Sequence, residues 1–256
     1  MSSKGIAFVT GAARGIGRAV ALRLAEDGFD VAVNDLEAKM KELESLVEEI
    51  RTKNSERETS IHVGDVSEDV QVREMVEAVV QKHGGLDVMV ANAGVAGLSR
   101  TPISQVSVEE WERVMNINAR SAFLCYKYAG LQMIKQGRGG RIIGASSIAG
   151  KRGITQWPYS ASKFAVRGLT QSAALEFGEH GITVNAYAPG AIDTPMLDGA
   201  SPAGAEQLRN FFKERSPLKT LGEATDVAGL VSFLASKESK FITGQSISIN
   251  GGLFFD

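Results

Sequence analysis

The sequence is poor in the residues that cross-link a chain or bind metal. Its one cysteine, Cys125, cannot form an internal disulfide and lies in an apolar helical stretch, so we expect a buried thiol in a cytoplasmic protein. Only three histidines are present, His62, His83 and His180, and they are scattered at the ends of predicted elements. We therefore expect no metal centre.

Excess charge and long apolar runs are lacking as well. The 28 basic and 30 acidic residues leave a net charge of −2, which gives no electrostatic basis for binding nucleic acid or an anionic membrane surface. No stretch approaches the roughly 18 apolar residues of a membrane span, and the first apolar run passes straight into a glycine loop, unlike a signal peptide. These features predict one globular domain over residues 1–256.

Short apolar runs alternate with longer helical patterns along the whole chain. The strand-like runs cover residues 6–10, 31–34, 60–63, 88–91, 141–145, 183–188 and 246–249. The helical patterns cover residues 15–27, 38–53, 69–83, 108–135, 159–180 and 225–235. This order predicts an α/β fold, a doubly wound parallel sheet of about seven strands with helices on both faces. Ligands bind such a sheet beyond the carboxyl ends of its strands.

A glycine-rich stretch, Thr10-Gly11-Ala12-Ala13-Arg14-Gly15-Ile16-Gly17, follows the first run and precedes a helical pattern. Glycines there allow a tight turn and a close approach of the backbone to a pyrophosphate at the helix N-terminus. The spacing is G-x-x-x-G-x-G and not G-x-G-x-x-G. Its place between a strand and a helix favours a dinucleotide-binding loop over an ordinary glycine-rich turn.

The second run ends at Asp35, where a carboxylate could accept hydrogen bonds from an adenosine ribose and repel a 2′-phosphate. Asp35 could also simply cap a helix. Arg14 favours the opposite choice, NADP, because a basic residue in the loop could pair with a phosphate. We give the direct repulsion by Asp35 more weight and predict NAD as the cofactor.

Two further strand ends could contact the same cofactor. After the third run, Asp65 could accept from an adenine amino group while Val66 packs on the ring, although capping of the next helix, with Ser67 as a competitor, is an equal alternative. After the fourth run come Asn92, Ala93 and Gly94. The small residues would let backbone approach the cofactor, and Asn92 could tie strand ends together.

Tyr159 and Lys163 stand four residues apart at the start of a helical pattern, so they share one face. An ammonium group favours the phenolate and lowers the pKa of a tyrosine, which could then act as an acid or base on a carbonyl oxygen. Such a pair also occurs by chance on solvated helices. The fifth run ends in Ser146 and Ser147, either of which could hold a substrate oxygen, and Asn118 sits in an apolar helical pattern as a possible water ligand or a satisfied buried amide.

Together these motifs resemble a classical short-chain dehydrogenase/reductase. They occur in the family's order from Ile6 to Gly252 and are completed by Pro189-Gly190 after the sixth run. The resemblance implies a water relay at Asn118, substrate orientation by Ser147, acid/base catalysis by Tyr159, and ribose contact with pKa lowering by Lys163. It also implies contacts from Gly190, Ile192 and Thr194 to the carboxamide side of a nicotinamide. The family commonly places the serine 13 residues before the tyrosine, at Ser146, but the pattern Ser-Ser-Ile-Ala-Gly favours Ser147.

The substrate side is less specific. Residues 193–216 are a plausible lid with Met196, Leu197, Phe211 and Phe212, and Gly199 and Gly204 as possible hinges. Together with Trp157 these residues favour a small neutral ketone, diketone, diol or polyol.

The tyrosine helix most resembles the acetoin/diacetyl reductase and butanediol dehydrogenase branch, with sugar-alcohol dehydrogenases as the alternative. A reductase of carrier-bound 3-oxoacyl groups and a catalytically idle redox sensor are further alternatives. Small residues at Ala161, Ala165 and Gly168, with the family's habit, suggest a homotetramer, and Phe254 and Phe255 are expected at an interface.

Overall fold

The computed structural model describes residues 3–97, 101–154, 156–200 and 204–255. Seven parallel strands form one sheet in the order β3-β2-β1-β4-β5-β6-β7. The strands are β1 (Ile6–Thr10), β2 (Asp30–Asp35), β3 (Thr59–Val63), β4 (Val88–Ala91), β5 (Gly140–Ala145), β6 (Ile182–Pro189) and β7 (Ser246–Ile249). The main helices are α1 (Gly15–Glu26), α2 (Met40–Lys53), α3 (Asp69–His83), α4 (Val108–Met115), α5 (Ser121–Gln136), α6 (Trp157–Phe177), α7 (Pro195–Ala200), α8 (Ala205–Arg215) and α9 (Ala224–Ala235).

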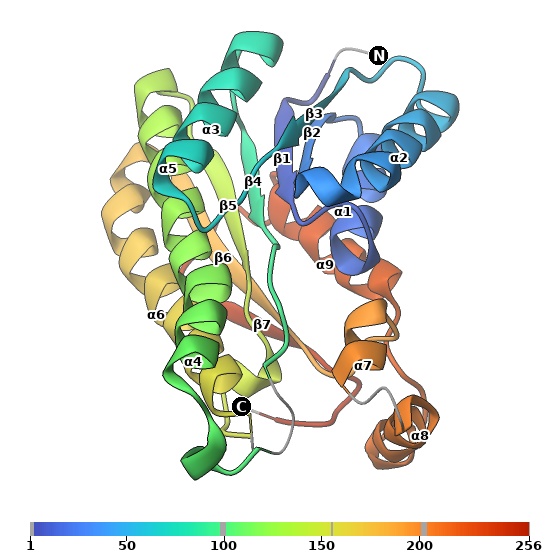
Figure 1. Cartoon of the computed structure of the whole chain (residues 1–256). Coiled ribbons are helices and arrows are strands. Elements are labelled where there is room, and N and C mark those ends of the chain that lie inside the picture. Colours follow the sequence, from blue (N-terminus) through green and yellow to red (C-terminus); the bar gives the residue numbers. More distant parts are fainter. Residues whose placement is uncertain (1–2, 98–100, 155, 201–203, 256) are drawn as a thin grey trace.

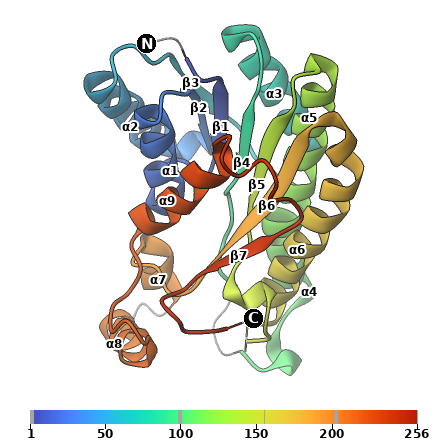
Figure 2. The same ribbon diagram turned by 180° about the vertical axis from the view of Figure 1, so that it is seen from behind.

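Helices cover both faces of the sheet, as Figures 1 and 2 show. Helices α1, α2 and α9 pack on one face around a core that includes Leu24, Leu46 and Val231. Helices α3, α5 and α6 pack on the other around Met89 and Met133. The central strands are buried on both faces, which explains why β4 is apolar throughout and β1 is apolar up to Thr10. The predicted doubly wound parallel sheet is confirmed.

The strand order reverses between β1 and β4, because the chain winds outward first through β2 and β3 and then through β5, β6 and β7. At such a point the connections leave in opposite directions and open a crevice beyond the carboxyl ends of the strands. The glycine loop follows β1, and Asn92 follows β4. The fold thus brings together two stretches that lie about 80 residues apart in sequence, as the separation of Gly11 and Asn92 shows.

The strand predictions agree with the structure to within a residue or so at each end, but the helices differ in two places. The single helix predicted over residues 108–135 is interrupted by a π-helical turn, η3 (Asn116–Arg120), which separates α4 from α5. The predicted lid contains two helices, α7 and α8, that the apolar pattern did not indicate because both lie on the surface. Residues 201–203 of that lid lie outside the described residues. Among the described helices, none has the length and apolar character that a bilayer span needs.

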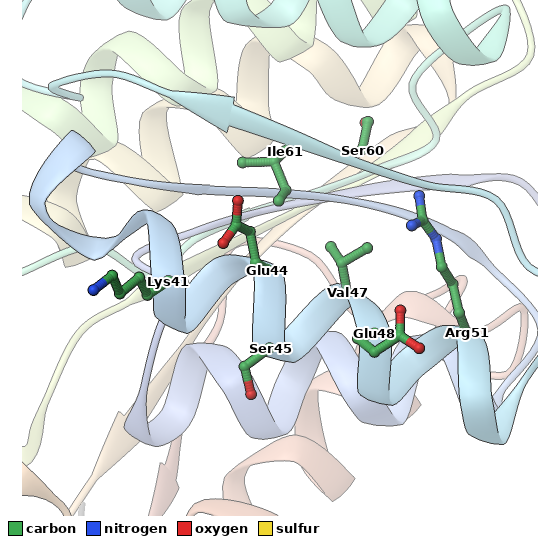
Figure 3. Close-up of a pocket in the computed structure, with 8 residues that line it drawn as sticks. All are labelled: Lys41, Glu44, Ser45, Val47, Glu48, Arg51, Ser60 and Ile61. Carbon is green, nitrogen blue, oxygen red and sulfur yellow. The ribbon is translucent and has the colours of Figure 1, made fainter.

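A shallow hollow lies at the outer edge of the sheet, beside edge strand β3 and far from the switch point. Figure 3 shows Ile61 pointing towards α2 and Ser60 pointing away from it. The lining residues are Lys41, Glu44, Ser45, Val47, Glu48, Arg51, Ser60 and Ile61. They carry charges of both signs, and none of the residues of the sequence motifs is among them.

On the far side of β3, Ser60 joins two histidines. Its Oγ lies 2.8 Å from Nε2 of His62 and 2.7 Å from Nε2 of His83. Burial lowers the pKa of His62 to about 4, and the neighbouring His83 adds to this. Burial also lowers the pKa of His83, although the carboxylates of Glu58 and Asp30 oppose the shift. Both rings are therefore neutral near pH 7.

We expect this cluster to make the protein acid-sensitive. His62 binds a proton more readily in the unfolded chain, with an ordinary pKa of 6.5, than in the folded chain, where it is about 4. Its contribution to stability is therefore complete above pH 6.5 and declines as the pH falls towards 4. Urea unfolding at a series of pH values should show a steeper loss in the native protein than in His62→Gln. Equal slopes for the two proteins would contradict this assignment.

Candidate active site

The glycine loop has the geometry of a cradle for a pyrophosphate. A Cβ at Gly17 would collide with the carbonyl oxygen of Gly11, and Gly11 itself has a left-handed φ of 63°. Arg14 occupies the N-cap of α1 without a capping side-chain bond, and the first turn contains no acidic residue. The N–H groups of that turn are thus left for an anion, which fits the phosphates of a dinucleotide. The side chain of Ile16 packs on the core below.

Asn92 ties three strands together at the switch point. Its Nδ2 donates to the carbonyl oxygens of Thr10 (2.9 Å) and Gly11 (3.0 Å), and its Oδ1 accepts from the hydroxyl of Tyr187 on β6 (2.8 Å). The backbone N–H groups of Asn92 and Ala93 both reach Oγ1 of Thr10. The predicted role of Asn92 in joining strand ends is confirmed by these bonds, while the part played by Tyr187 gave no signal in the sequence.

The carboxylate of Asp35 lies against the glycine loop. Its Oδ2 accepts from the N–H of Ala13 at 3.1 Å, and its Oδ1 accepts from the N–H of Leu36 at 2.9 Å. Arg14 is exposed beside Glu42, whose carboxyl pKa is lowered mainly by a hydrogen bond from Lys39 and to a smaller degree by the charge of Arg14. Asp35 is therefore held at the mouth of the loop, whereas Arg14 has an acidic neighbour.

At the third strand end Asp65 does not cap the following helix, and its predicted contact with an adenine stays a prediction. Its Oδ1 accepts from both the N–H (2.8 Å) and the hydroxyl (2.7 Å) of Ser67, so it closes a local turn. The N-cap of α3 is Glu68, and neither Asp65 nor Ser67 caps that helix. Val66 is 6% exposed and belongs to the core. The turn holds Asp65 at the carboxyl end of β3, on the adenine side of the predicted site.

The π-helical turn places Asn118. Its Nδ2 donates to the carbonyl oxygen of Val95 and to Oγ of Ser162, both at 3.0 Å, and its Oδ1 accepts from the N–H of Val95 at 2.8 Å. The amide therefore joins the loop after β4 to α6. A Cβ on Gly94 would lie 3.2 Å from Asn118 Oδ1 and 3.5 Å from Lys163 Nζ, so all three residues converge. Of the two interpretations, the satisfied buried amide describes this side chain; the water relay stays a prediction.

Tyr159 lies in the first turns of α6, which begins with Trp157 and Pro158, and Lys163 follows one turn later on the same face. Burial raises the pKa of the Tyr159 phenol, and a hydrogen bond with the Ser147 side chain acts in the opposite direction. Lys163 was expected to lower this pKa. In the structure its Nζ instead donates to the carbonyl oxygen of Ala145 (2.8 Å) and lies 5.5 Å from the centre of the Tyr159 ring.

Lys163 is itself perturbed, because it is only 4% exposed. Burial lowers the pKa of its ammonium group to about 8. Near neutral pH it can therefore carry a proton or release one, depending on small changes in its surroundings.

The two serines after β5 are distinguished by their partners. Oγ of Ser146 donates to the carbonyl oxygen of Lys163 at 3.1 Å, so it braces α6. Ser147 faces Tyr159, and its Oγ accepts from the N–H of Ala149 at 3.1 Å. The arrangement favours Ser147 as the serine next to the reacting group, as the local sequence pattern indicates.

The stretch after β6 meets the glycine loop. Gly190 donates its N–H to Ile249 at 3.0 Å, and Ile192 is buried and bridges to Gly222. The side chain of Thr194 lies 3.6 Å from the position that a Cβ would take on Gly15. Pro189 ends β6, so this stretch crosses the carboxyl edge of the sheet towards β1.

The lid helices are joined to this stretch by one arginine. Arg209 on α8 pairs with Asp193 at 2.9 Å and with Asp198 on α7 at 2.5 Å. Trp157 was expected to contribute apolar surface to the substrate pocket. It is instead 47% exposed and lines an apolar groove together with Trp111. The rings of Phe211 and Phe212 meet edge to face, with their centres 5.3 Å apart.

Comparison with known proteins gives a consistent picture. A family model described as enoyl-(acyl carrier protein) reductase matches residues 11–254. A short-chain dehydrogenase/reductase of Armillaria gallica is 49% identical over 98% of this chain and 96% of its own length. A 3-oxoacyl-(acyl-carrier-protein) reductase of Staphylococcus epidermidis is 42% identical over 97% and 98%, respectively.

Two solved structures resemble the fold closely. A levodione reductase has a TM-score of 0.93 at 33% identity, with 98% of each chain covered. An acetoin dehydrogenase of Enterobacter cloacae has a TM-score of 0.86 at 33% identity, with 99% of this chain and 96% of its own covered.

Removal of the Asn92 side chain should weaken both the fold and the cofactor site. Asn92→Ala leaves the Tyr187 hydroxyl and two carbonyl groups without their partner, and we expect a loss of about 3 kcal/mol in unfolding free energy. NADH affinity, measured by fluorescence titration, should also fall because the glycine loop loses its anchor. Asn185→Ala is the matched control, since Asn185 is another buried strand amide, bonded to Ile242 and Gln245 away from the loop. The same NADH affinity in both variants would contradict the anchoring role.

Proposed function

The chain belongs to the short-chain dehydrogenase/reductase family, and we propose that it is an NAD(H)-dependent oxidoreductase that interconverts a small neutral ketone and the corresponding secondary alcohol. A diketone, acetoin or a vicinal diol is the substrate class that the site suits best. The observation that carries the proposal is the convergence of Ser147, Tyr159 and Lys163 between β5 and α6. A bound nicotinamide dinucleotide would supply or accept the hydride.

In the proposed reaction Tyr159 handles the proton. During reduction its hydroxyl donates to the carbonyl oxygen, and during oxidation the phenolate removes the proton of the alcohol. Ser147, which already contacts Tyr159, holds the same oxygen. Lys163, whose pKa burial lowers to about 8, stabilises the phenolate once the ammonium is drawn towards it. Asn118 fixes the loop after β4 against α6 and so positions Lys163, and its proposed water relay would return the proton to solvent.

The glycine loop and the carboxyl ends of the strands would hold the cofactor. Gly11, Gly15 and Gly17 with the uncapped start of α1 suit the pyrophosphate, Asp35 suits the adenosine ribose, and Asp65 and Val66 would contact the adenine. Ala93 and Gly94, which follow β4, would let the backbone approach the middle of the cofactor. Gly190, Ile192 and Thr194 would then meet the carboxamide side, since Thr194 already lies over Gly15.

The substrate assignment rests on the character of the site and on the relatives. Among the described residues no acidic or basic side chain is bonded to Tyr159 or Ser147, and the nearby Lys163 lies 5.5 Å from the centre of the Tyr159 ring, so a neutral substrate is favoured. The similarity to a levodione reductase and to an acetoin dehydrogenase supports a small ketone or its alcohol. A polyol is the nearest alternative.

A carrier-bound 3-oxoacyl substrate is the second candidate function. It is favoured by the match to the Staphylococcus epidermidis reductase and by the description of the family model. The net charge of −2 gives no general attraction to an acidic carrier. A homotetramer stays a prediction; Phe123, Leu131 and Phe164 on the outer faces of α5 and α6 are exposed apolar side chains that such an assembly could cover.

The first test is the initial rate of NADH oxidation with diacetyl, acetoin, a ketohexose, a cyclic ketone and a 3-oxoacyl thioester. We expect diacetyl or acetoin to be the best substrate. Tyr159→Phe should reduce kcat by roughly 10²- to 10⁴-fold, because the proton donor is lost, while NADH still binds. Tyr128→Phe is the control, since Tyr128 is bonded to Asp69 on the outer surface. Retained turnover in Tyr159→Phe would refute the acid/base role, and a preference for the thioester would support the second candidate.

Cofactor choice tests Asp35 separately. We expect the native protein to prefer NADH over NADPH, because the carboxylate repels a 2′-phosphate. Asp35→Ser should reduce the ratio of the two kcat/KM values by roughly 10- to 100-fold. Glu37→Ser removes an exposed carboxylate only two residues away and should leave the ratio nearly unchanged. An equal ratio in the native protein and Asp35→Ser would show that another group sets the preference.

A further inference from the structure

The segment that follows β7 crosses the carboxyl edge of the sheet above the candidate site. We call residues 250–254 the strap. Strand β7 pairs with β6, so the strap begins next to Gly190. A Cβ on Gly190 would lie 2.9 Å from Cα of Asn250 and 3.1 Å from Cδ1 of Leu253. Figures 1 and 2 show the chain turning back here from the side of α7 and α8 towards the start of α6.

The shape of the strap is set by Asn250 and two glycines. Asn250 Nδ2 donates to the carbonyl oxygen of Phe254 (2.7 Å), and its Oδ1 accepts from the N–H of Gly252 (2.8 Å). Gly251 and Gly252 have left-handed φ values of 59° and 83°. Side chains at these two positions would lie 2.8 Å from Ser216 Oγ and from Pro217 Cγ, respectively. The strap is therefore a closely fitted turn seated on the end of the lid, not a loose extension.

The far end of the strap meets the stretch that carries Ser147. The guanidinium of Arg152 stands over the ring of Phe254 at 5.3 Å. Arg152 is in turn held to the turn after Ser147, because its N–H donates to the carbonyl oxygen of Ile148 at 3.0 Å. A second link runs from Lys151 Nζ to Ser248 Oγ at 2.9 Å. Phe254 is half-buried, whereas the next residue, Phe255, is 82% exposed.

These contacts join three segments at the carboxyl edge of the sheet. The strap touches the stretch after β6 at Gly190, the end of the lid at Ser216 and Pro217, and the stretch after β5 at Arg152. The last of these stretches contains Ser147, which is hydrogen-bonded to Tyr159.

We propose that the strap is the outer wall of the substrate pocket, and that Phe254, held in place by Arg152, restricts the site to compact carbonyl compounds. The proposal rests on the function proposed above, because it assumes that the reacting carbonyl lies at Ser147 and Tyr159. Within its own chain Phe254 contacts Arg152, and its expected place at a subunit interface stays a prediction.

Access to the site can be measured without turnover. Cys125 is the only native cysteine, and burial raises the pKa of its thiol to about 12, so it should not react. In Ser147→Cys a new thiol reports on the floor of the site. We expect a small reagent, methyl methanethiosulfonate, to label it far faster than fluorescein maleimide. Adding Phe254→Ala should raise the maleimide rate several-fold and leave the small reagent unaffected, whereas adding Phe255→Ala should change neither.

Arg152→Gln provides an independent variant in case Phe254→Ala does not fold. It keeps the ring but removes the charge that holds it, and it should shift the ratio of labelling rates in the same direction. If neither Phe254→Ala nor Arg152→Gln changes that ratio in folded protein, the strap is not a wall of the site. An equal effect of Phe255→Ala would also overturn the proposal, because it would indicate a general loosening.

Turnover tests the consequence for specificity. With the native serine, Phe254→Ala should raise kcat/KM for a bulky aryl ketone relative to diacetyl by about tenfold, with NADH affinity unchanged. An unchanged ratio would refute the role of Phe254 in specificity. Labelling and turnover together distinguish a failure of the proposed function from a failure of the strap as a wall. Altered labelling with no ketone reduced by the native protein would overturn the proposed function and retain the wall, whereas ketone reduction with unaltered labelling would do the reverse.

Discussion

The side chain of Asn92 is the constraint on which the rest of the site depends. It stands at the point where the strand order reverses, and it bonds at once to the end of β1, to the first glycine of the loop and to Tyr187 on β6. A parallel sheet aligns its strands through backbone bonds, but those bonds stop at the carboxyl edge. Beyond that edge a few backbone bonds remain, such as that from Ala12 to Asn34, and side chains supply further links between the loops. Asn92 does so for the cofactor half and the substrate half together.

Burial changes the pKa of a lysine in the site and also restricts which residues fit around it. Lys163 is almost completely enclosed, and the loss of water lowers the pKa of its ammonium group to about 8. The enclosure requires backbone to pass very close by: a Cβ on Gly150 would lie 2.6 Å from Ser146 Oγ and would crowd the carbonyl of Lys163. The π-helical turn at Asn118 is a related adjustment, since one extra residue in the helix directs the amide towards Val95 and Ser162. The side chains of Asn118, Ser146 and Lys163 are therefore each hydrogen-bonded to another part of the chain.

The two halves of the carboxyl edge are closed in different ways. On the cofactor side, rigid turns follow single strands, and the contacts are mostly local, as with Asp65 and Ser67. On the substrate side, the closure is made by segments far apart in the chain, namely the lid with Arg209 and the strap with Phe254. A family can retain the first set of contacts and vary the second, which is consistent with the range of substrates named for its members.

The sequence by itself determined the strands, the order of the motifs and the residue types at the strand ends. Apolar runs such as Val88–Ala91 are unambiguous because both faces of a central strand are buried, and glycines such as Gly17 are required by sterics that no other residue meets. Only the tertiary structure decided which partners these residues have. It separated Ser146 from Ser147, assigned Lys163 Nζ to Ala145, brought Tyr187 to Asn92 and placed Phe254 against Arg152. A local sequence pattern indicates the environment that a residue requires, such as burial or a left-handed φ. The partner that meets the need comes from a distant part of the chain, and periodicity carries no information about it.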